Sequence, residues 1–409
     1  MFFINPFRPG KRLTSPELFA GRQRELHDAT QRVIQAASDN AMHTLVTGER
    51  GIGKSSFSSQ LQGILLGDET FLNLIGANKA DQPFKFLVAE HVAQKGQGAA
   101  ELAIGLLAGL EGESKLKRYF NYSLDFQIDL GPLKTTAKQK TSDTSDVITE
   151  FIAQMAKVIA GSGGADGVIL VVDEVDRVAG KAGVSTFFKV TTERLSAAGM
   201  NNVAFVLIGM IGTLDDLKRE HASVGRVFLP QPLPLLTKPE TVGLLTKALL
   251  GTKVTIDADA ASTVFDFSGG YPNAVHLIGE SAFTLAMGSE RVITKQLVRE
   301  AVDKVIAQSA PEDFDPLYLR FKGRSRQLIR LMASYDEPDV PSKYLLKKLN
   351  VKATDISNNF DTMLNGDVIV RPQDGYYRLR DPLFREYVRD LVVRDTEPVQ
   401  RRPQKREAE

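Results

Sequence analysis

The sequence predicts an α/β protein whose buried parallel sheet is flanked by helices, and three apolar segments indicate the sheet. Residues 168–172 and 203–211 are continuous apolar runs, which is typical of strands buried on both faces of a parallel sheet. A third apolar segment begins at Thr44 and leads through a glycine-rich loop into a helical pattern that ends near Leu66. We therefore expect an α/β fold with strands and helices in separate layers.

Length and composition are those of a globular protein with more than one domain. The chain has 409 residues, of which 43% are hydrophobic and 25% are charged. A chain of this length exceeds what one hydrophobic core usually supports, so we expect two or three domains. A formal net charge of +1 gives no overall electrostatic field that would attract nucleic acid or a membrane surface. The chain has no cysteine, which excludes disulfides and thiolate chemistry. Apolar runs far below the roughly 18 residues of a membrane span, with no secretory signal pattern, predict a cytoplasmic protein without a membrane partner.

The loop after the first strand has the spacing of a phosphate-binding loop. Its pattern, G-x-x-x-x-G-K-S, is formed by Gly48, Glu49, Arg50, Gly51, Ile52, Gly53, Lys54 and Ser55, and Ser56 follows. Backbone N–H groups of such a loop surround phosphates, the lysine reaches the β- and γ-phosphates and the serine ligates Mg²⁺. The alternative is a glycine-rich turn that matches the pattern by chance. The strand before the loop and the helix after it favour the phosphate-binding interpretation.

Two acidic residues follow the second apolar run. Asp173 can hold the Mg²⁺ shell and Glu174 can polarise the attacking water as general base, which indicates hydrolysis rather than transfer to a small molecule. Alternatively, the strand leaves the core through a charged turn. After the third run, Thr213 is a candidate for sensing the γ-phosphate, or it caps a helix.

Short motifs in a fixed order carry a resemblance to a known family. They are Phe19-Ala-Gly21-Arg22-Gln-Arg-Glu25-Leu26, the phosphate-binding loop, the apolar strand with Asp173 and Glu174, Ser223-x-x-Arg226-x-Phe228, Gly270-Tyr271-Pro272 and Arg380-Asp381-Pro382-Leu383-Phe384. The chain resembles the AAA+ superfamily, in the branch shared by origin-recognition-type initiators, archaeal-type ATPases and the STAND signalling ATPases. The resemblance implies a P-loop NTPase fold with a helical lid and a C-terminal winged helix, and ATP with Mg²⁺ as cofactors.

The resemblance also implies roles for individual residues. Arg226 falls where the family has an arginine finger that reaches the γ-phosphate of a neighbouring subunit, which implies a homo-oligomer in the ATP state; the alternative is a surface arginine at a helix end. Arg22 and Pro272 fall where the family holds adenine, although Pro272 can equally mark a helix start. Asn273 stands near where initiators carry a lid arginine, which favours the STAND-like interpretation, whereas the lack of a histidine beyond His276 does not.

The predicted domains are a nucleotide-binding domain at 1–235, with an insertion at about 96–145, a helical lid at 236–310, a winged helix at 311–393 and a disordered polar tail at 394–409. Thr237 and Glu240 form a capping box at the first lid helix, and further helical patterns cover 258–267, 273–286 and 294–306. In the insertion, glycines weaken the helical pattern at 96–112, alternation predicts a strand or hairpin at 119–130, and 134–140 is expected to be a basic loop. We expect this insertion either to contact a partner protein or DNA, or to form a solvent-exposed hairpin.

The third helix expected in the winged helix, at 354–364 with Thr354 as N-cap, contains Asp355 and Asp361 but no lysine or arginine. Phosphate contacts supply most of the affinity for nucleic acid, so DNA is possible as a partner but not favoured. We therefore expect an ATP-binding and ATP-hydrolysing protein that acts as a nucleotide-dependent switch or assembly factor for a partner protein. The alternatives are an ATP-dependent DNA-binding initiator or loader that uses the winged helix, and a small-molecule kinase.

Overall fold

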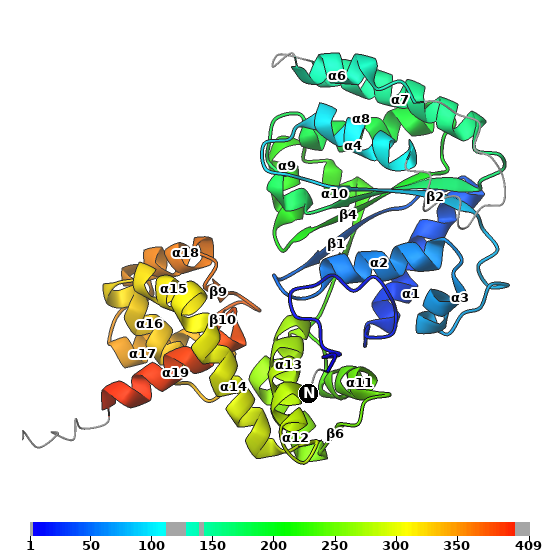
Figure 1. Cartoon of the computed structure of the whole chain (residues 1–409). Helices are drawn as coiled ribbons and strands as arrows, with labels where there is room; N and C mark the ends of the chain where they lie inside the picture. The colour runs from blue at the N-terminus through cyan, green and yellow to red at the C-terminus, as the bar shows by residue number, and fades with distance from the viewer. Residues whose placement is uncertain (1–2, 112–127, 139–142, 397–409) are drawn as a thin grey trace, which may run out of the picture. The chain divides into compact units, whose positions relative to one another are not determined.

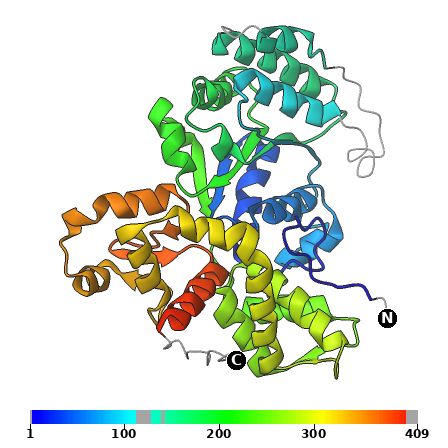
Figure 2. The same ribbon diagram turned by 60° about the vertical axis from the view of Figure 1, so that its left-hand side comes forward.

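The computed structural model describes residues 3–111, 128–138 and 143–396 (Figures 1 and 2). The described chain forms two compact units. One is Gly10–Leu236, and the other combines Met1–Pro9 with Thr237–Glu409. None of the described helices has the length and apolar character that crossing a membrane requires. Each unit is described by itself below.

The first unit is built on a five-stranded parallel sheet. Its strands are β1 (His43–Gly48), β2 (Phe86–Val92), β3 (Gly167–Asp173), β4 (Val203–Met210) and β5 (Phe228–Pro232). Their order is β2-β3-β4-β1-β5, so β4 lies between the strand before the phosphate-binding loop and the strand that ends at Asp173. Because all pairs are parallel, the loops after β1, β3 and β4 emerge at one edge of the sheet.

Helices cover both faces of this sheet (Figure 1). On one face lie α1 (Gln23–Val33), α2 (Lys54–Leu65) and the short α3 (Glu69–Leu72). The other face carries α4 (Ala99–Glu111), α6 (Gly131–Lys138), α7 (Thr144–Ala160), α8 (Val184–Ala197), α9 (Thr213–Glu220) and α10 (Val224–Val227). Successive β4 residues alternate between the two cores, with Phe205 in one and Val206 in the other. The expected parallel sheet between helix layers is therefore confirmed.

One expectation for residues 96–145 is wrong. The stretch whose glycines weaken the helical pattern contains the helix α4, and Gly105 and Gly109 allow this helix to approach β2 closely. A Cβ on Gly105 would lie 2.1 Å from Nδ1 of His91. The basic stretch expected to be a loop forms α6, at whose start Oδ1 of Asp129 accepts the N–H of Gly131 over 2.9 Å. Most of the hairpin predicted at 119–130 lies outside the described residues.

The second unit begins with four helices. They are α11 (Lys238–Leu249), α12 (Ala258–Ser268), α13 (Pro272–Met287) and α14 (Lys295–Ser309), with the two-stranded parallel pair β6 (Thr255–Ile256) and β7 (Val292–Ile293). The predicted capping box is present: the Thr237 hydroxyl accepts the N–H of Glu240, whose carboxylate accepts the N–H of Thr237. The N-terminal residues pack on α13, where Asn5 Nδ2 donates to the Glu280 carbonyl over 2.9 Å.

The C-terminal part of this unit contains further helices and a small antiparallel sheet. The helices are α15 (Asp315–Arg320), α16 (Gly323–Ala333), α17 (Ser342–Leu349), α18 (Ser357–Asn365) and α19 (Pro382–Thr396). The sheet has the order β8-β10-β9, formed by Val340–Pro341, Tyr376–Leu379 and Ile369–Val370. An Asp-Gly turn lies in the hairpin between β9 and β10, with φ of +80° at Gly375. Thr354 is not the N-cap of the third helix, because residues Ala353–Asp355 form a separate 3₁₀ turn.

Candidate functional site

The glycines of the phosphate-binding loop are required by its backbone. The loop joins β1, which ends at Gly48, to α2, which begins at Lys54. Gly51 and Gly53 have φ of +77° and +86°, in the region that glycine adopts without steric cost. A Cβ on Gly48 would lie 2.8 Å from Cγ2 of Ile52, closer than a real contact allows. The loop leads directly into the N-terminus of α2. At a helix N-terminus, backbone N–H groups without an intrahelical partner and the helix dipole attract anions.

Lys54 lies over its own loop. Its Nζ donates to the carbonyl oxygens of Gly48 and Glu49, at 3.0 Å each, and lies 3.2 Å from Sδ of Met210 at the end of β4. The structure thus brings the ammonium group between the ends of β1 and β4. Met210 was not predicted as a site residue, although its place as the last residue of the third apolar strand is visible in the sequence.

The other predicted loop residues take different positions. Ile52 is 2% exposed, Arg50 is exposed, and Ser55 is half-buried at the first turn of α2. Ser56 is buried, and its Oγ accepts the N–H of Leu13 over 3.0 Å. The Ser56 hydroxyl therefore anchors the N-terminal segment of this unit on α2.

Asp173 is the last residue of β3 and Glu174 follows it, at the same edge of the sheet as the phosphate-binding loop. Asp173 is 3% exposed, and its Oδ1 accepts the N–H of Glu174 over 2.8 Å. Glu174 has φ of +56°, and its carboxylate pairs with Arg177, with 2.6 Å between Oε2 and Nη2. Oδ1 of Asp176 accepts the N–H of Met210 over 3.1 Å, which fastens this acidic loop to the end of β4. Two strand spacings, about 10 Å, separate β3 from β1.

Thr213 is buried just after the end of β4. It is the first residue of α9 and 1% exposed, and its hydroxyl donates to the Met210 carbonyl over 2.7 Å. The hydroxyl also lies 2.6 Å from the position a Cβ on Gly209 would take. The N-cap of α9 is Gly212, so Thr213 does not cap the helix with its side chain, and a role for Thr213 in sensing the γ-phosphate stays a prediction.

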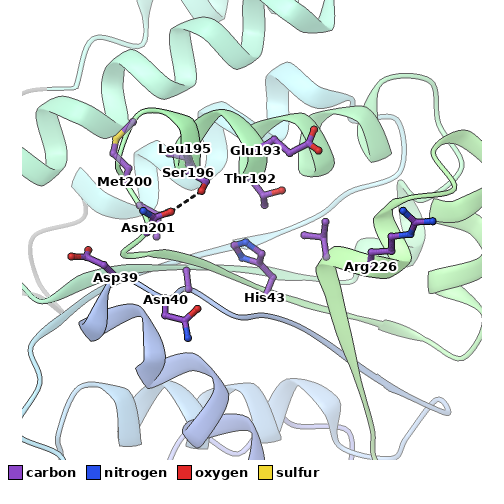
Figure 3. Close-up of a pocket in the computed structure, with 13 residues that line it drawn as sticks. Asp39, Asn40, His43, Thr192, Glu193, Leu195, Ser196, Met200, Asn201 and Arg226 are labelled. Carbon is purple, nitrogen blue, oxygen red and sulfur yellow. Dashed lines mark hydrogen bonds between the residues drawn. The ribbon is translucent and has the colours of Figure 1, made fainter.

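Arg226 lies at the opposite edge of the sheet. It is exposed on α10, immediately before β5, and lines a pocket of about 370 Å³ together with His43, the first residue of β1 (Figure 3). The other lining residues are Asp39, Asn40, Ala41, Thr192, Glu193, Leu195, Ser196, Met200, Asn201, Val203 and Val227. Because β1 begins at this pocket and ends at the phosphate-binding loop, the structure does not bring Arg226 to Lys54 of its own chain.

His43 lines this pocket and also contacts the core of the unit. Its Nδ1 accepts the N–H of Phe205 over 3.0 Å, and its ring lies 5.6 Å from that of Phe228. Burial lowers the pKa of His43 from 6.5 to about 4, so the imidazole is neutral at neutral pH. The ring therefore belongs to the apolar core beneath the pocket.

Arg22 lies at the phosphate-binding loop. Its side chain is 3% exposed, and Nη2 donates to the Ile52 carbonyl and, over 3.4 Å, to the Pro234 carbonyl. Pro272 is in the other unit, as the first residue of α13, which matches the helix-start interpretation. An adenine contact for Pro272 stays a prediction.

The oxygen ligands offered near the loop suit Mg²⁺. The Ser55 hydroxyl and the Asp173 carboxylate are hard donors, and Mg²⁺ is usually held by one or two carboxylates together with water and substrate phosphates. Within the described ranges, no group of three His, Cys, Asp or Glu side chains forms a dedicated metal cage. Ser55 and Asp173 therefore suit a Mg²⁺ ion that would be held partly by the protein and partly by the phosphates of a bound nucleotide.

Comparison with known proteins agrees with this geometry. The structure is similar to a Walker-type ATPase of Pyrococcus abyssi, with a TM-score of 0.60 and 17% identity over 93% of this chain and 99% of that chain. It is also similar to the Aeropyrum pernix ORC2 protein, whose structure contains ADPNP and ADP, with a TM-score of 0.59 and 14% identity over 95% and 99% of the two chains. No protein-family model and no curated protein sequence matches the chain. The similarity in structure, the strand order and the phosphate-binding loop together establish that this chain has the AAA+ P-loop ATPase fold.

Proposed function

We propose that this protein binds and hydrolyses ATP with Mg²⁺ and acts as a nucleotide-dependent switch or assembly factor for a partner protein. One observation carries the proposal: a strand, a glycine-rich loop and a helix place Lys54 at the sheet edge from which Asp173 and Glu174 also emerge. A lysine over a loop of backbone amides, with two carboxylates two strand positions away at the same edge of the sheet, suits phosphoryl transfer to water.

The residues act on the phosphates in distinct ways. The N–H groups at the start of α2 and the Lys54 ammonium bind the β- and γ-phosphates, for which Lys54 exchanges its carbonyl acceptors at Gly48 and Glu49 for phosphate oxygens. Ser55 and Asp173 would hold Mg²⁺, which supplies positive charge to the phosphate oxygens when bound. Glu174 accepts a proton from the attacking water.

Glu174 must leave its partner Arg177 to reach that water. The pair is partly exposed, with 48% of the Arg177 side chain and 38% of the Glu174 side chain accessible. Exposed ion pairs contribute only about 0–1 kcal/mol, so the carboxylate can separate from the guanidinium at small cost.

Arg226 would act on a neighbouring copy. It is exposed at the sheet edge opposite the loop, so its guanidinium can serve the γ-phosphate of another subunit but not that of its own chain. A guanidinium there would neutralise charge that develops during phosphoryl transfer. The proposal therefore includes a homo-oligomer in the ATP state.

The C-terminal elements favour a protein partner over DNA. The helix α18 presents Asp361 and no basic residue, and Asn359 is used inside the unit, where its Nδ2 donates to Ser325 Oγ over 2.9 Å. A helix without basic residues gains little from phosphate contacts. Positive charge is instead found on α17, at Lys343, Lys347 and Lys348.

Glu174→Gln tests the proposal, because it removes the general base and leaves the loop intact. We expect wild-type protein to release phosphate from Mg-ATP without an added acceptor, and Glu174→Gln to bind Mg-ATP normally but hydrolyse it at least about a hundredfold more slowly. Unchanged turnover would remove Glu174 from the mechanism, and a requirement for an acceptor would indicate a kinase.

The electrophoretic mobility of duplex DNA mixed with the protein at physiological salt, with and without ATP, tests which partner the protein binds. Salt-sensitive, ATP-dependent binding of DNA would contradict the protein-partner proposal.

A further inference from the structure

Arg22 places a buried guanidinium against the backbone of the phosphate-binding loop. Its side chain is 3% exposed and its Nη2 donates to the Ile52 carbonyl. Its Nη1 lies 3.1 Å from the position a Cβ on Gly53 would take. The guanidinium therefore occupies the space beside two consecutive loop residues, immediately before Lys54.

The same guanidinium reaches a second segment of the unit. Its Nη2 lies 3.4 Å from the carbonyl oxygen of Pro234, which follows β5. The neighbouring residue Leu233 is fixed to the sheet, because its N–H donates to the Thr47 carbonyl over 2.8 Å. Arg22 thus joins the loop to a segment that is itself fastened to β1, the strand from which the loop emerges.

The backbone at Arg22 turns this side chain inward. Arg22 has φ of +60° and precedes α1, and Gly21 before it has φ of +69°. A left-handed conformation is uncommon for a residue with a branched or long side chain and persists where the surroundings determine it. Phe19, 4% exposed, fixes the segment in the core that α1 and α2 share.

We propose that Arg22 is a positioning residue for the phosphate-binding loop, which it acts on through the Ile52 carbonyl. By holding that carbonyl, Arg22 keeps the N–H groups that follow it directed toward a bound phosphate chain. The proposal rests on ATP binding at this loop and specifies how the site recognises its ligand. Arg22 strengthens binding of the phosphates and not of the base. A substitution of Arg22 should therefore lower the affinity by the same factor for every ligand that carries a polyphosphate.

The experiment compares ligands with and without a base. Dissociation constants of Mg-ATP, Mg-GTP and Mg-tripolyphosphate are measured by titration calorimetry for wild type, Arg22→Gln and Arg22→Lys. Hydrogen bonds from charged groups typically change affinity by about tenfold or more. We expect Arg22→Gln to lose about this factor for each ligand that wild type binds, by the same amount, and Arg22→Lys, which can still donate to one carbonyl, to lose less.

Arg24→Gln is the matched control. Arg24 lies two residues further along the chain, its side chain is 90% exposed and it faces Asp28 at 3.8 Å. This variant should bind all three ligands as wild type does. Thermal melting of each variant checks that the fold is kept, and if Arg22→Gln does not fold, Arg22→Lys carries the comparison.

Two results would overturn the role of Arg22: affinities that the substitution leaves unchanged, or a loss for Mg-ATP that Mg-tripolyphosphate does not share. The second result would indicate a contact with adenine. Failure of the proposed function has a different signature, because folded wild-type protein would then bind none of the three ligands.

Discussion

Nη2 of Arg177 lies 2.6 Å from Oε2 of Glu174, so the carboxylate proposed as general base is paired with a cation three residues further along the chain. Glu174 is also held by its backbone, which has φ of +56° and donates its N–H to Asp173 over 2.8 Å. The main chain of Glu174 is therefore fixed at the end of β3, and the ion pair sets the direction of its side chain.

Arg177→Ala should raise kcat for ATP by about two- to fivefold and leave KM unchanged, because it removes an exposed pair worth about 0–1 kcal/mol that competes for the Glu174 carboxylate. Steady-state phosphate release measures both constants. Arg219→Ala is the control, since it breaks a comparable exposed pair with Asp216 in α9. A kcat that falls in Arg177→Ala would show that Arg177 orients Glu174 for the reaction.

Mixing two inactive variants tests whether Arg226 acts in trans. Arg226→Ala retains its phosphate-binding loop, and Lys54→Ala retains its arginine, so each alone should lose most ATPase activity. Mixed assemblies contain sites with an intact loop beside an intact Arg226, and we expect the mixture to regain activity above the sum of its parts. Full activity in Arg226→Ala alone would contradict the proposed role in a neighbouring subunit.

Two glycines in helices should respond oppositely to alanine. Gly105→Ala places a Cβ 2.1 Å from the His91 ring, which forces α4 away from β2 and should destabilise the protein by about 1–3 kcal/mol. Gly243→Ala on α11 meets nothing within 4 Å and should stabilise it by about 0.5–1 kcal/mol. Urea unfolding followed by circular dichroism measures both. Equal effects would mean that the close packing of α4 on β2 is absent.

Acid should destabilise the first unit through His43. Burial lowers the pKa of His43 from 6.5 to about 4, so the unfolded chain takes up a proton in a pH range where the folded chain does not. The contribution of His43 to the free energy of unfolding is therefore fully present above pH 6.5 and is lost as the pH drops toward 4, by at most about 3 kcal/mol.

The variant His43→Gln should flatten part of this decline. The remainder includes His276 in the second unit, whose pKa burial also lowers to about 4. Urea unfolding across this pH range compares the variant with wild type. A decline of the same size in His43→Gln would show that His43 does not titrate as described.

The strands and the loop were predictable because their signals are local. Three continuous apolar runs and the glycine spacing around Lys54 correspond directly to β1, β3, β4 and the start of α2. Strand order is not a local property: nothing in the sequence shows that β4 lies between β1 and β3, or that this order places Met210 against Lys54.

Residues 134–138 show where local reasoning failed, because their basic sequence was expected to form a loop and they belong to the helix α6. In α4 the glycines lower helix propensity, and close packing on β2 offsets that cost. For Arg22, the motif indicated a place at the nucleotide but not the direction of the side chain, which depends on the left-handed backbone and on the distant Pro234 carbonyl.

Binding of Mg-ATP to purified wild-type protein and to Lys54→Ala, measured side by side by titration calorimetry, tests the central claim most directly. The account predicts saturable binding of one nucleotide per chain by wild type, with a loss of about a hundredfold or more in Lys54→Ala while the melting temperature is retained. Folded wild-type protein that does not bind Mg-ATP, or equal affinity in Lys54→Ala, would contradict it.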